Sequence, residues 1–414
     1  MGGSSMKAIS FLGPADYKTV TYVYQGQEFT TNLFPEALIH FFPELQLLYL
    51  FATPTVQSHP NLAELKKRIP PDKLKVVPIP EGHTEADLWE IFSALTNTVA
   101  EREEVVFDIT HSFRSIPFLS FLAAAYLRAA RRANIRAVVY GAYEARPKDD
   151  PGPRPVFDLT PFVSLLDWLA ATNQFIYTGD AQYLARLLYR EGEVRRSGAL
   201  KHAGEALESF SLAVMLCRPL EVMEDAGNIE NVLKKAAKDM AQWAQPFTVM
   251  ADRILAEYGK YSLPEPTKDA AVSLKHQLSL IRWYAKHGQI MQAVTLAREW
   301  VVTAVGWRLY GSFLLTKDTR ERIERGLSGL CLVAQKRLSA EELNEVGQTL
   351  RTWPEAETIT DLWNHLSTVR NDLDHAGMNP NPMKATKLCQ KTQNDVLPLL
   401  ETLGRQWKLL EEWL

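Results

Sequence analysis

The strongest constraint on the fold is a change of pattern near residue 160. Before it, short runs rich in β-branched and aromatic residues alternate with helical stretches, whereas beyond it the strand pattern stops and helical periodicity continues. Near-continuous apolar strands that alternate with helices are typical of a parallel, doubly wound sheet. The sequence therefore predicts an α/β domain followed by an all-α region.

The positions of the elements follow from the same pattern. We expect strands at residues 7–12, 45–52, 73–79, 105–109 and 136–141, and helices at residues 34–42, 61–68, 85–100 and 116–133. Alternating residues on both sides of Gln25 and Gly26 predict a β-hairpin, residues 19–24 with 28–31, inserted after the first strand. Residues 146–155 are dense in proline and charge, which predicts an exposed loop.

Length and composition fit two globular domains. A chain of 414 residues exceeds the size at which single cores usually stop growing, and 46% hydrophobic with 23% charged residues argues against disorder or a fibrous repeat. We expect residues 1–5 to be an expression scar ahead of a native Met6. Residues 6–160 then form the α/β domain, 161–260 a helical connector and 261–414 a second helical domain.

Composition also excludes several classes of protein. The apolar runs are shorter than the roughly 20 residues of a membrane span, and the start lacks the features of a signal peptide, so we expect a cytoplasmic protein without a membrane span. Three scattered cysteines predict neither a disulfide nor a zinc framework. Residues 82–87 read as a helix start with Thr84 as cap and not as a metal cluster. The net charge of −3 argues against a broad basic surface, so any nucleic-acid site must be local.

Three loops follow the expected strands at the edge where doubly wound sheets bind ligands. Gly13 follows the first strand and Thr53 the second. The third loop offers Thr110, His111, Ser112 and Arg114 before a helix start, which suits phosphates or a ribose-phosphate chain.

A purely structural interpretation of this third loop stays open. Ser115 could cap the following helix, Arg114 could pair with a surface carboxylate, and His111 could be a satisfied polar residue. The chain has neither a dinucleotide-binding nor a Walker-type glycine motif, so a nucleotide bound here would be a signal and not a fuel.

Near the end of the chain Arg370 is followed by Asn371 and, five positions after the arginine, by His375. Arginine can stabilise an anionic phosphorane, and histidine can transfer a proton near neutral pH, so the pair suits RNA cleavage without a metal ion. One copy supplies a single histidine, which favours a composite site in a two-fold dimer. The alternative is a solvated helix end, in which Arg370 pairs with Asp374.

Taken together, these segments resemble the CRISPR-associated CARF-HEPN ribonucleases of type III CRISPR systems, and the resemblance spans nearly the whole chain. It rests on five segments, of which residues 108–118 are the most specific. They are residues 10–13, the hairpin leading to 34–38, 108–118, 297–300, and Arg370 and Asn371 with His375.

The resemblance implies a Rossmann-like CARF domain at residues 6–160 and a HEPN ribonuclease domain at residues 261–414. It implies a homodimer, or a higher even oligomer, that binds cyclic oligoadenylate as an allosteric activator, with cyclic tetra-adenylate the expected ring, and then cuts single-stranded RNA. No metal or other cofactor is expected. The ligand-binding residues would be Gly13, Thr53, Thr110, His111, Ser112 and Arg114, and the catalytic residues Arg370, Asn371 and His375.

Two other functions stay open. The same sensing domain could control a non-catalytic effector, such as a transcriptional regulator, which would require a helix-turn-helix with a basic recognition helix. Alternatively, a partner protein could hold a ribonuclease with a degenerate sensor in check. The basic stretches at residues 128–132 and 234–238 are typical of solvated helix faces.

Overall fold

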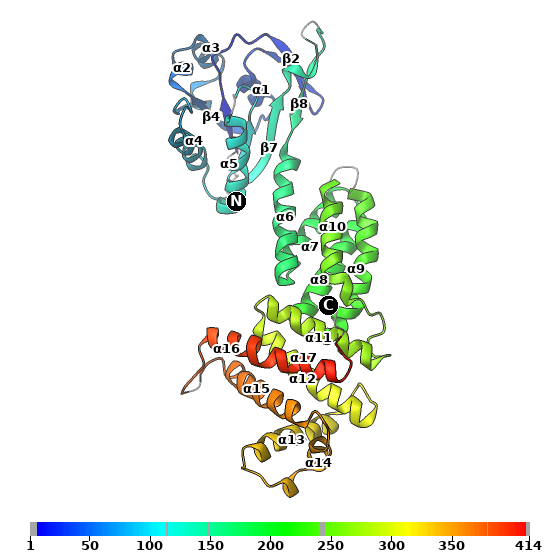
Figure 1. Ribbon diagram of the computed structural model, residues 1–414. Helices are drawn as coiled ribbons and strands as arrows, with labels where there is room; N and C mark the ends of the chain where they lie inside the picture. The colour runs from blue at the N-terminus through cyan, green and yellow to red at the C-terminus, as the bar shows by residue number, and fades with distance from the viewer. Residues whose placement is uncertain (1–5, 113–114, 148–149, 241–244, 379, 411–414) are drawn as a thin grey trace. The chain divides into compact units, whose positions relative to one another are not determined.

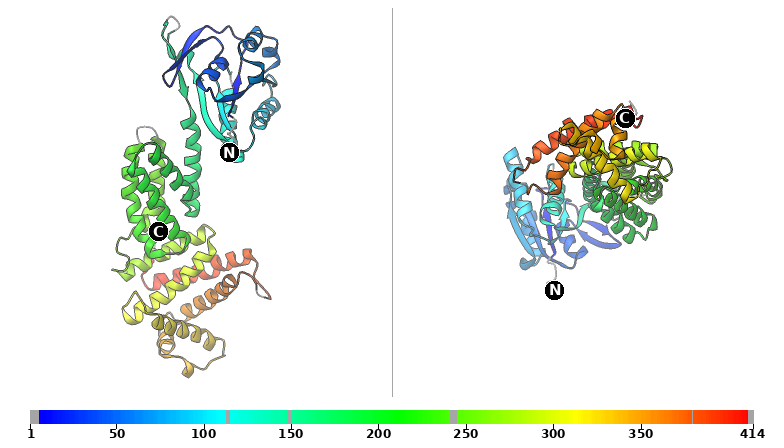
Figure 2. Two further views of the ribbon diagram at one scale, coloured as in Figure 1. Left: turned by 180° about the vertical axis from the view of Figure 1, so that it is seen from behind. Right: turned by 90° about the horizontal axis from the view of Figure 1, so that it is seen from below.

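The structure is a computed structural model that describes residues 6–112, 115–147, 150–240, 245–378 and 380–410. The expected expression scar at residues 1–5 lies outside the described residues. The chain divides into two compact units, Met1–Asp167 and Trp168–Leu414. Figure 1 shows a sheet with flanking helices in the first unit and helices in the second, and Figure 2 shows the same elements from two further sides.

The first unit is built on an eight-stranded sheet in the order β3-β2-β8-β7-β6-β1-β4-β5. Five neighbouring strands, from β7 to β5, are parallel. β8 runs antiparallel to β7, and the β2–β3 hairpin extends the sheet beyond β8. The strands are β1 Met6–Phe11, β2 Val20–Tyr24, β3 Gln27–Thr31, β4 Leu45–Ala52, β5 Leu74–Pro78, β6 Glu104–Asp108, β7 Asn134–Gly141 and β8 Arg154–Asp158.

Helices contribute to a hydrophobic core on each face of this sheet. Leu38 and Leu65 pack into one core with strand residues such as Leu50, and Ile91 and Ala123 pack into the other. The sheet is therefore doubly wound, as predicted. The helices are α1 Phe34–Phe41, α2 Pro54–Gln57, α3 Pro60–Arg68, α4 Glu85–Asn97 and α5 Ile116–Arg131, with short 3-10 segments η1 Pro71–Lys73 and η2 Tyr143–Ala145.

All the expected strands and helices of this unit are present, with ends displaced by three residues or fewer. The prediction of a wholly parallel sheet was wrong, because β8 is antiparallel to β7. The loop expected at residues 146–155 also ends early, since Arg154 and Pro155 already belong to β8 and Arg154 is buried. Proline normally argues against a strand, and here the Pro155 carbonyl still accepts a hydrogen bond from Ala142 N at 2.9 Å.

The second unit is helical throughout the residues that the structure describes, and its first helix, α6, spans the division between the units. One large core runs through it, in which Trp300 and Trp363 are fully buried. Tyr284 Oη donates to Val214 O at 2.6 Å and so ties α11 (Ala270–Lys286) to α8 (Gly198–Met215).

Its helices are α6 Thr160–Thr178, α7 Gln182–Val194, α8 Gly198–Met215, α9 Pro219–Met240, α10 Gln245–Tyr258, α11 Ala270–Lys286, α12 Ile290–Tyr310, α13 Lys317–Ala334, α14 Glu345–Arg351, α15 Ala356–Asp374, α16 Ala385–Lys391 and α17 Leu397–Gln406. Short 3-10 segments are η3 Gly259–Tyr261 and η4 Ala340–Glu342, and η5 Thr392–Val396 is a π-helical turn. Within the described residues, no helix combines the length and apolarity of a membrane span.

Candidate functional site

The first candidate site lies at the carboxyl ends of β1, β4 and β6. These three strands are neighbours in the parallel part of the sheet, so the loops that follow them meet at one edge. Gly13 follows β1, Thr53 follows β4, and Thr110 follows β6. The structure therefore brings the predicted loops to the same side of the sheet.

Asp108 anchors the end of β6 below this edge. Its side chain is fully buried, Ser10 Oγ donates to Oδ2 at 2.6 Å, and Thr110 N donates to Oδ1 at 2.8 Å. Burial raises the pKa of the carboxyl to about 6, although the hydrogen bonds oppose this shift. The end of β1 and the loop after β6 are thus joined through one acidic side chain.

The two hydroxyls of the third loop bond back to the protein. Gly141 N donates to Thr110 Oγ1 at 2.8 Å, and Ser112 Oγ donates to Ile109 O at 2.6 Å. Both residues remain partly exposed. Each hydroxyl is held in place while it keeps hydrogen-bonding capacity on its open side.

His111 is buried and links this loop to two other segments. Phe34 N donates to its Nε2 at 3.1 Å, and its ring stacks on Tyr17 with centroids 3.8 Å apart. Burial lowers the pKa of the imidazole to about 4, against a raising effect of a backbone hydrogen bond to Asn32. His111 is therefore neutral at pH 7, and its described contacts position the loop.

Gly13 lies in the tightest part of the site. Its N–H donates to Tyr17 Oη at 3.0 Å, its carbonyl accepts from Asn61 Nδ2 at 3.2 Å, and a Cβ would lie 2.6 Å from Tyr17 Oη. Thr53 is buried at the neighbouring strand end, where its hydroxyl accepts from Val56 N at 3.4 Å and caps α2. Glycine is needed at residue 13 because the tyrosine occupies the space of a side chain.

Sequence reasoning missed the two side chains that hold these loops together. Tyr17 accepts from the Gly13 N–H and Asn61 donates to the Gly13 carbonyl, and no local pattern marks either residue. Ser115 is the N-cap of α5 but makes no side-chain cap hydrogen bond, whereas His111 is a satisfied polar residue, as the structural interpretation expected. Arg114, expected to bind the ligand, lies outside the described residues.

The second candidate site lies at the end of α15. Arg370 Nη2 is 3.0 Å from Asp374 Oδ2, and both side chains are nearly half exposed. Asn371 and His375 are exposed as well, and His375 is the C-cap of the helix. The arginine and the histidine therefore occupy the last turn of one helix and its end, in contact with solvent.

The helix ends in a left-handed turn that fixes this geometry. Ala376 and Gly377 have φ of 51° and 71°, and Gly377 N donates to Asp372 O at 3.2 Å. The buried Asp372 carboxylate accepts from Met383 N at 2.8 Å and so holds the returning chain. Gly377 is the stop that the sequence predicted.

The end of α15 holds only part of the groups that acid-base cleavage of RNA would use. The pairing of Arg370 with Asp374 was the alternative drawn from the sequence, and the structure shows it. Within the described residues, the His375 ring has no side-chain hydrogen-bond partner that would orient it. A permanent cation and one proton-transfer group are present, whereas acid-base cleavage of RNA benefits from two such groups.

Residues 297–300, which contributed to the resemblance, are structural. Arg298 pairs with Glu324 through both nitrogens at 3.2 and 2.8 Å and lies 4.9 Å from the Trp363 ring, and Trp300 Nε1 donates to Leu274 O at 2.9 Å. Among the described residues, no three His, Cys, Asp or Glu side chains gather as metal ligands.

Most of the sheet, with its inserted hairpin and the loops at its carboxyl edge, lies in the part of the chain that a CARF family model matches. Residues 7–144 match the family model of the CARF domain of the CRISPR system endoribonuclease Csx1. Residues 164–263 match the second domain of the CRISPR-associated protein MJ1674. The chain is thus similar to CRISPR-associated proteins over residues 7–144 and 164–263.

Two individual proteins are similar to the chain. The CRISPR-associated protein MJ1674 of Methanocaldococcus jannaschii is 26% identical over 169 residues, which are 40% of this chain and 25% of that protein. The chain therefore matches about a quarter of the length of this relative. The solved structure of Enterococcus italicus Csm6 bound to cyclic hexa-2'-fluoro-hexa-dAMP aligns with 99% of this chain and 96% of its own, at 10% identity and a TM-score of 0.46.

Proposed function

We propose that this chain is a single-stranded-RNA endoribonuclease of type III CRISPR antiviral defence, activated when its CARF domain binds a cyclic oligoadenylate. One observation carries the proposal: a CARF domain shares a chain with an exposed Arg370 and His375 at the end of one helix. In this proposal residues 261–414 form the HEPN domain, residues 161–260 connect it to the sensor, and the protein acts in the cytoplasm.

The proposed ligand site uses the loops at the carboxyl edge of the sheet. Thr110 and Ser112 offer partly exposed hydroxyls to a phosphate or a ribose. Gly13 would contribute through its position at the end of β1, where Tyr17 and Asn61 hold its backbone. Arg114 and Thr53 would complete the contacts. His111 would act mainly by holding the loop, because its ring is buried and its Nε2 accepts from Phe34 N. The expected ring is cyclic tetra-adenylate.

An exposed apolar stripe on α5 supports a homodimer. Phe118, Leu122 and Tyr126, each four residues apart, are 65%, 38% and 50% exposed, and Trp89 on α4 is 64% exposed. Contiguous exposed apolar groups of this kind mark interaction surfaces. A two-fold dimer also suits a cyclic ligand, because equivalent loops from each protomer can hold opposite halves of the ring.

The proposed chemistry needs no metal ion. The Arg370 guanidinium would leave Asp374 and stabilise the phosphorane that forms when the ribose 2'-hydroxyl attacks the phosphate. His375 would transfer a proton, and Asn371 would position the pair. The second copy would supply the second proton-transfer group, so the cut would occur at a composite site between two protomers.

The test combines a double substitution with a matched control. Arg370→Ala with His375→Ala is expected to abolish cleavage of a fluorescent single-stranded RNA in the presence of cyclic tetra-adenylate and EDTA. Arg325→Ala removes an arginine in a similar exposed i,i+4 pair, with Glu321, and should leave cleavage unchanged.

Three results would contradict the proposal. Undiminished cleavage by the double variant would remove the site, and a requirement for Mg2+ would remove the mechanism. Wild-type cleavage that ignores rings of three, four and six adenylates would remove the activation. If the wild-type protein never cuts RNA but changes affinity for DNA with ligand, the regulator alternative stands.

A further inference from the structure

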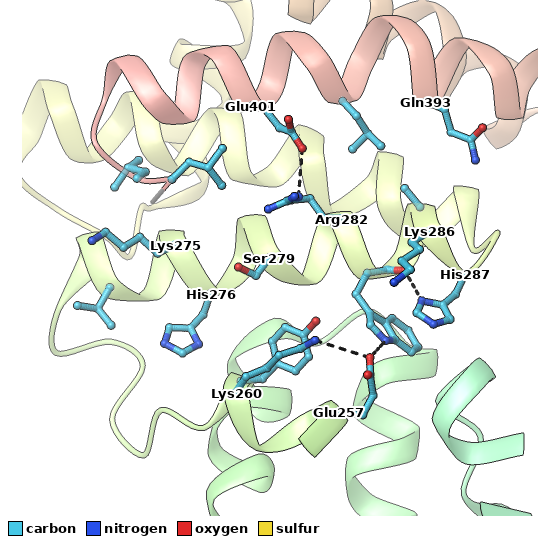
Figure 3. Close-up of a pocket in the computed structure, with 17 residues that line it drawn as sticks. Glu257, Lys260, Lys275, His276, Ser279, Arg282, Lys286, His287, Gln393 and Glu401 are labelled. Atoms are coloured by element: carbon cyan, nitrogen blue, oxygen red, sulfur yellow. Dashed lines mark hydrogen bonds and ion pairs between the residues drawn. The ribbon is translucent and has the colours of Figure 1, made fainter. Parts of the chain in front are cut away.

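The second unit contains a cavity of about 620 Å³ away from the residues proposed for catalysis. Its floor is one face of α11, and its sides come from η3 and the end of α10 on one side and from η5, α17 and residues 409–410 on the other. Figure 3 shows the side chains of α11 between Glu401 and Gln393 on one side and Lys260 and Glu257 on the other. This volume falls in the range of small-ligand sites, roughly 300–1,000 Å³.

The floor carries cations along its whole length. Lys275, Ser279, Arg282 and Lys286 follow one another at steps of four, three and four residues, which places them on one side of the helix. At a rise of about 1.5 Å per residue, the outer two lysines are about 16 Å apart along the axis. Because Lys275 and Arg282 have partners, a negatively charged ligand would meet Lys286 at the C-terminal end of α11.

The acidic groups of the cavity are already engaged. Glu257 Oε1 accepts from Trp283 Nε1 at 2.8 Å and lies 3.7 Å from Lys260 Nζ, and Glu401 holds Arg282 Nε at 3.1 Å. Four cationic side chains thus face two carboxylates. Within the described residues, Lys286 forms no ion pair. Lys275 also has a partner of its own, so Lys286 is the cation that the described lining leaves available to a phosphate.

The remaining lining suits the other parts of a nucleotide. Ser279, His276 and Gln393 can exchange hydrogen bonds with a sugar or a base edge. Burial lowers the pKa of His276, so its ring is neutral at pH 7 and can both donate and accept. Leu397 and Leu409 form an apolar wall, and Gln393 lies on a π-helical turn, a feature frequent at functional sites.

We propose that this cavity binds one nucleoside phosphate unit, with the phosphate near Lys286 and the base against the leucine wall. The unit can be a free nucleotide or one nucleotide of a single-stranded RNA, and the chemistry of recognition is the same for both. The volume admits one such unit and not a folded nucleic acid. This site is independent of the CARF loops and of Arg370, so it does not depend on the function proposed above.

The test measures binding of uridine 5'-monophosphate, of inorganic pyrophosphate and of a short single-stranded RNA made uncleavable by 2'-fluoro substitution, by calorimetry on the full chain. Lys286 is exposed, so Lys286→Glu should fold normally, and it should weaken nucleotide binding at least tenfold. The matched control, Lys317→Glu, changes the same charge on a lysine that is 90% exposed and does not line the cavity, and it should change affinity less than twofold. Ser279→Trp fills the cavity and should also abolish binding.

Each outcome is decisive. If the protein binds the mononucleotide and Lys286→Glu weakens this binding, the ligand is a free nucleotide. If the protein binds only the RNA and Lys286→Glu weakens that binding, the ligand is one nucleotide of an RNA strand. Pyrophosphate binding as tight as that of the nucleotide would overturn the role of the leucine wall. No binding of either nucleotide probe, or equal losses in the two charge variants, would overturn the proposal. Failure here would leave RNA cleavage through Arg370 unaffected.

Discussion

The loops around Thr110 and the end of α15 carry similar functional groups but treat them in opposite ways. His111 is 8% exposed, stacked on Tyr17 and bonded to Phe34 N, whereas His375 is exposed at a helix end. In the first region the chain fixes the side chains of Thr110, His111 and Ser112 through its own contacts. In the second it leaves the functional groups in solvent, with Asp374 as the only charged neighbour that the described residues give Arg370.

The two regions therefore differ in what they require to bind a ligand or to act on a phosphate. A buried, hydrogen-bonded loop is preorganised, and a ligand can bind it with little loss of conformational freedom. Exposed groups in high dielectric act weakly on a phosphate, because water screens them. For the cleavage proposed above, the end of α15 would need a second surface that excludes water, such as a second copy of the chain.

The largest expected effect separates the two histidines. His375→Ala should lower cleavage by roughly 10²–10⁴-fold, the usual contribution of a general acid or base, with the melting temperature unchanged. His111→Ala leaves Phe34 N unpaired and should destabilise the protein by about 1–3 kcal/mol. Cleavage rates and calorimetric melting of both variants check this. An equal loss of stability in the two variants would contradict the distinction between a structural His111 and an exposed His375.

The next effect is the pH dependence of stability that arises from the buried side chains of Asp108 and His111. Asp108 has a raised pKa, about 6, so its contribution to stability is present below its ordinary value of 3.8 and is lost as the pH rises through 6. His111 has a lowered pKa, about 4, so its contribution is present above 6.5 and is lost as the pH falls through 4.

These contributions oppose each other between pH 4 and 6.5. Relative to Asp108→Asn, the wild-type protein should lose about 3 kcal/mol as the pH rises from 4 to 7, and relative to His111→Gln it should lose about 3 kcal/mol as the pH falls over the same range. Native-state hydrogen exchange of amides in β1 and β6 measures the stability of this unit. If the stability difference between the wild-type protein and each variant did not change with pH, the assigned protonation states would be wrong.

A smaller effect tests whether the exposed site is shared between two copies. Mixing the wild-type protein with a tenfold excess of the Arg370→Ala, His375→Ala double variant should lower activity per wild-type protomer about tenfold, because nearly every wild-type copy then pairs with an inactive one. The control is the same mixture assayed before subunits exchange. Activity that stays constant after exchange would show a site complete in one protomer.

The smallest effect concerns the resting partner of Arg370. Asp374→Asn removes an exposed i,i+4 pair and should change the free energy of unfolding by less than about 0.5 kcal/mol. It should lower the KM for RNA about twofold, because the guanidinium no longer leaves a carboxylate on binding a phosphate. Glu321→Gln, the acid of the Arg325 pair, is the matched control. An increase in KM would give Asp374 a positioning role.

Much of the fold was accessible from the sequence because local chemistry determines it. The apolar runs of β4 and β6 and the Thr84 cap with Asp87 of α4 are read within a few residues, and the structure confirms the elements and the capping box. The sequence did not predict β8, because its residues, Arg154–Asp158, follow a proline-rich stretch and its position depends on pairing with β7.

The candidate sites show the same distinction between features that the local sequence determines and features that depend on tertiary contacts. The sequence placed Thr110 and Gly13 in loops at the carboxyl edge of the sheet, since strand ends can be counted along the chain. It did not identify Tyr17 and Asn61, whose contacts with Gly13 depend on tertiary folding. Nor did it identify the cavity on α11, which is assembled from segments more than 100 residues apart.

The buried Asp372 lies between Arg370 and His375 and holds Met383 N, so the intervening residues are more than a spacer. A residue inserted between Arg370 and Asp372 would rotate this carboxylate out of the core by about 100°, and both the helix end and the returning chain would lose their anchor. Insertions after Gly377 would leave the bond from Gly377 N to Asp372 O in place. Length variation in natural or engineered forms of this chain should therefore accumulate after Gly377 and be rejected before Asp372.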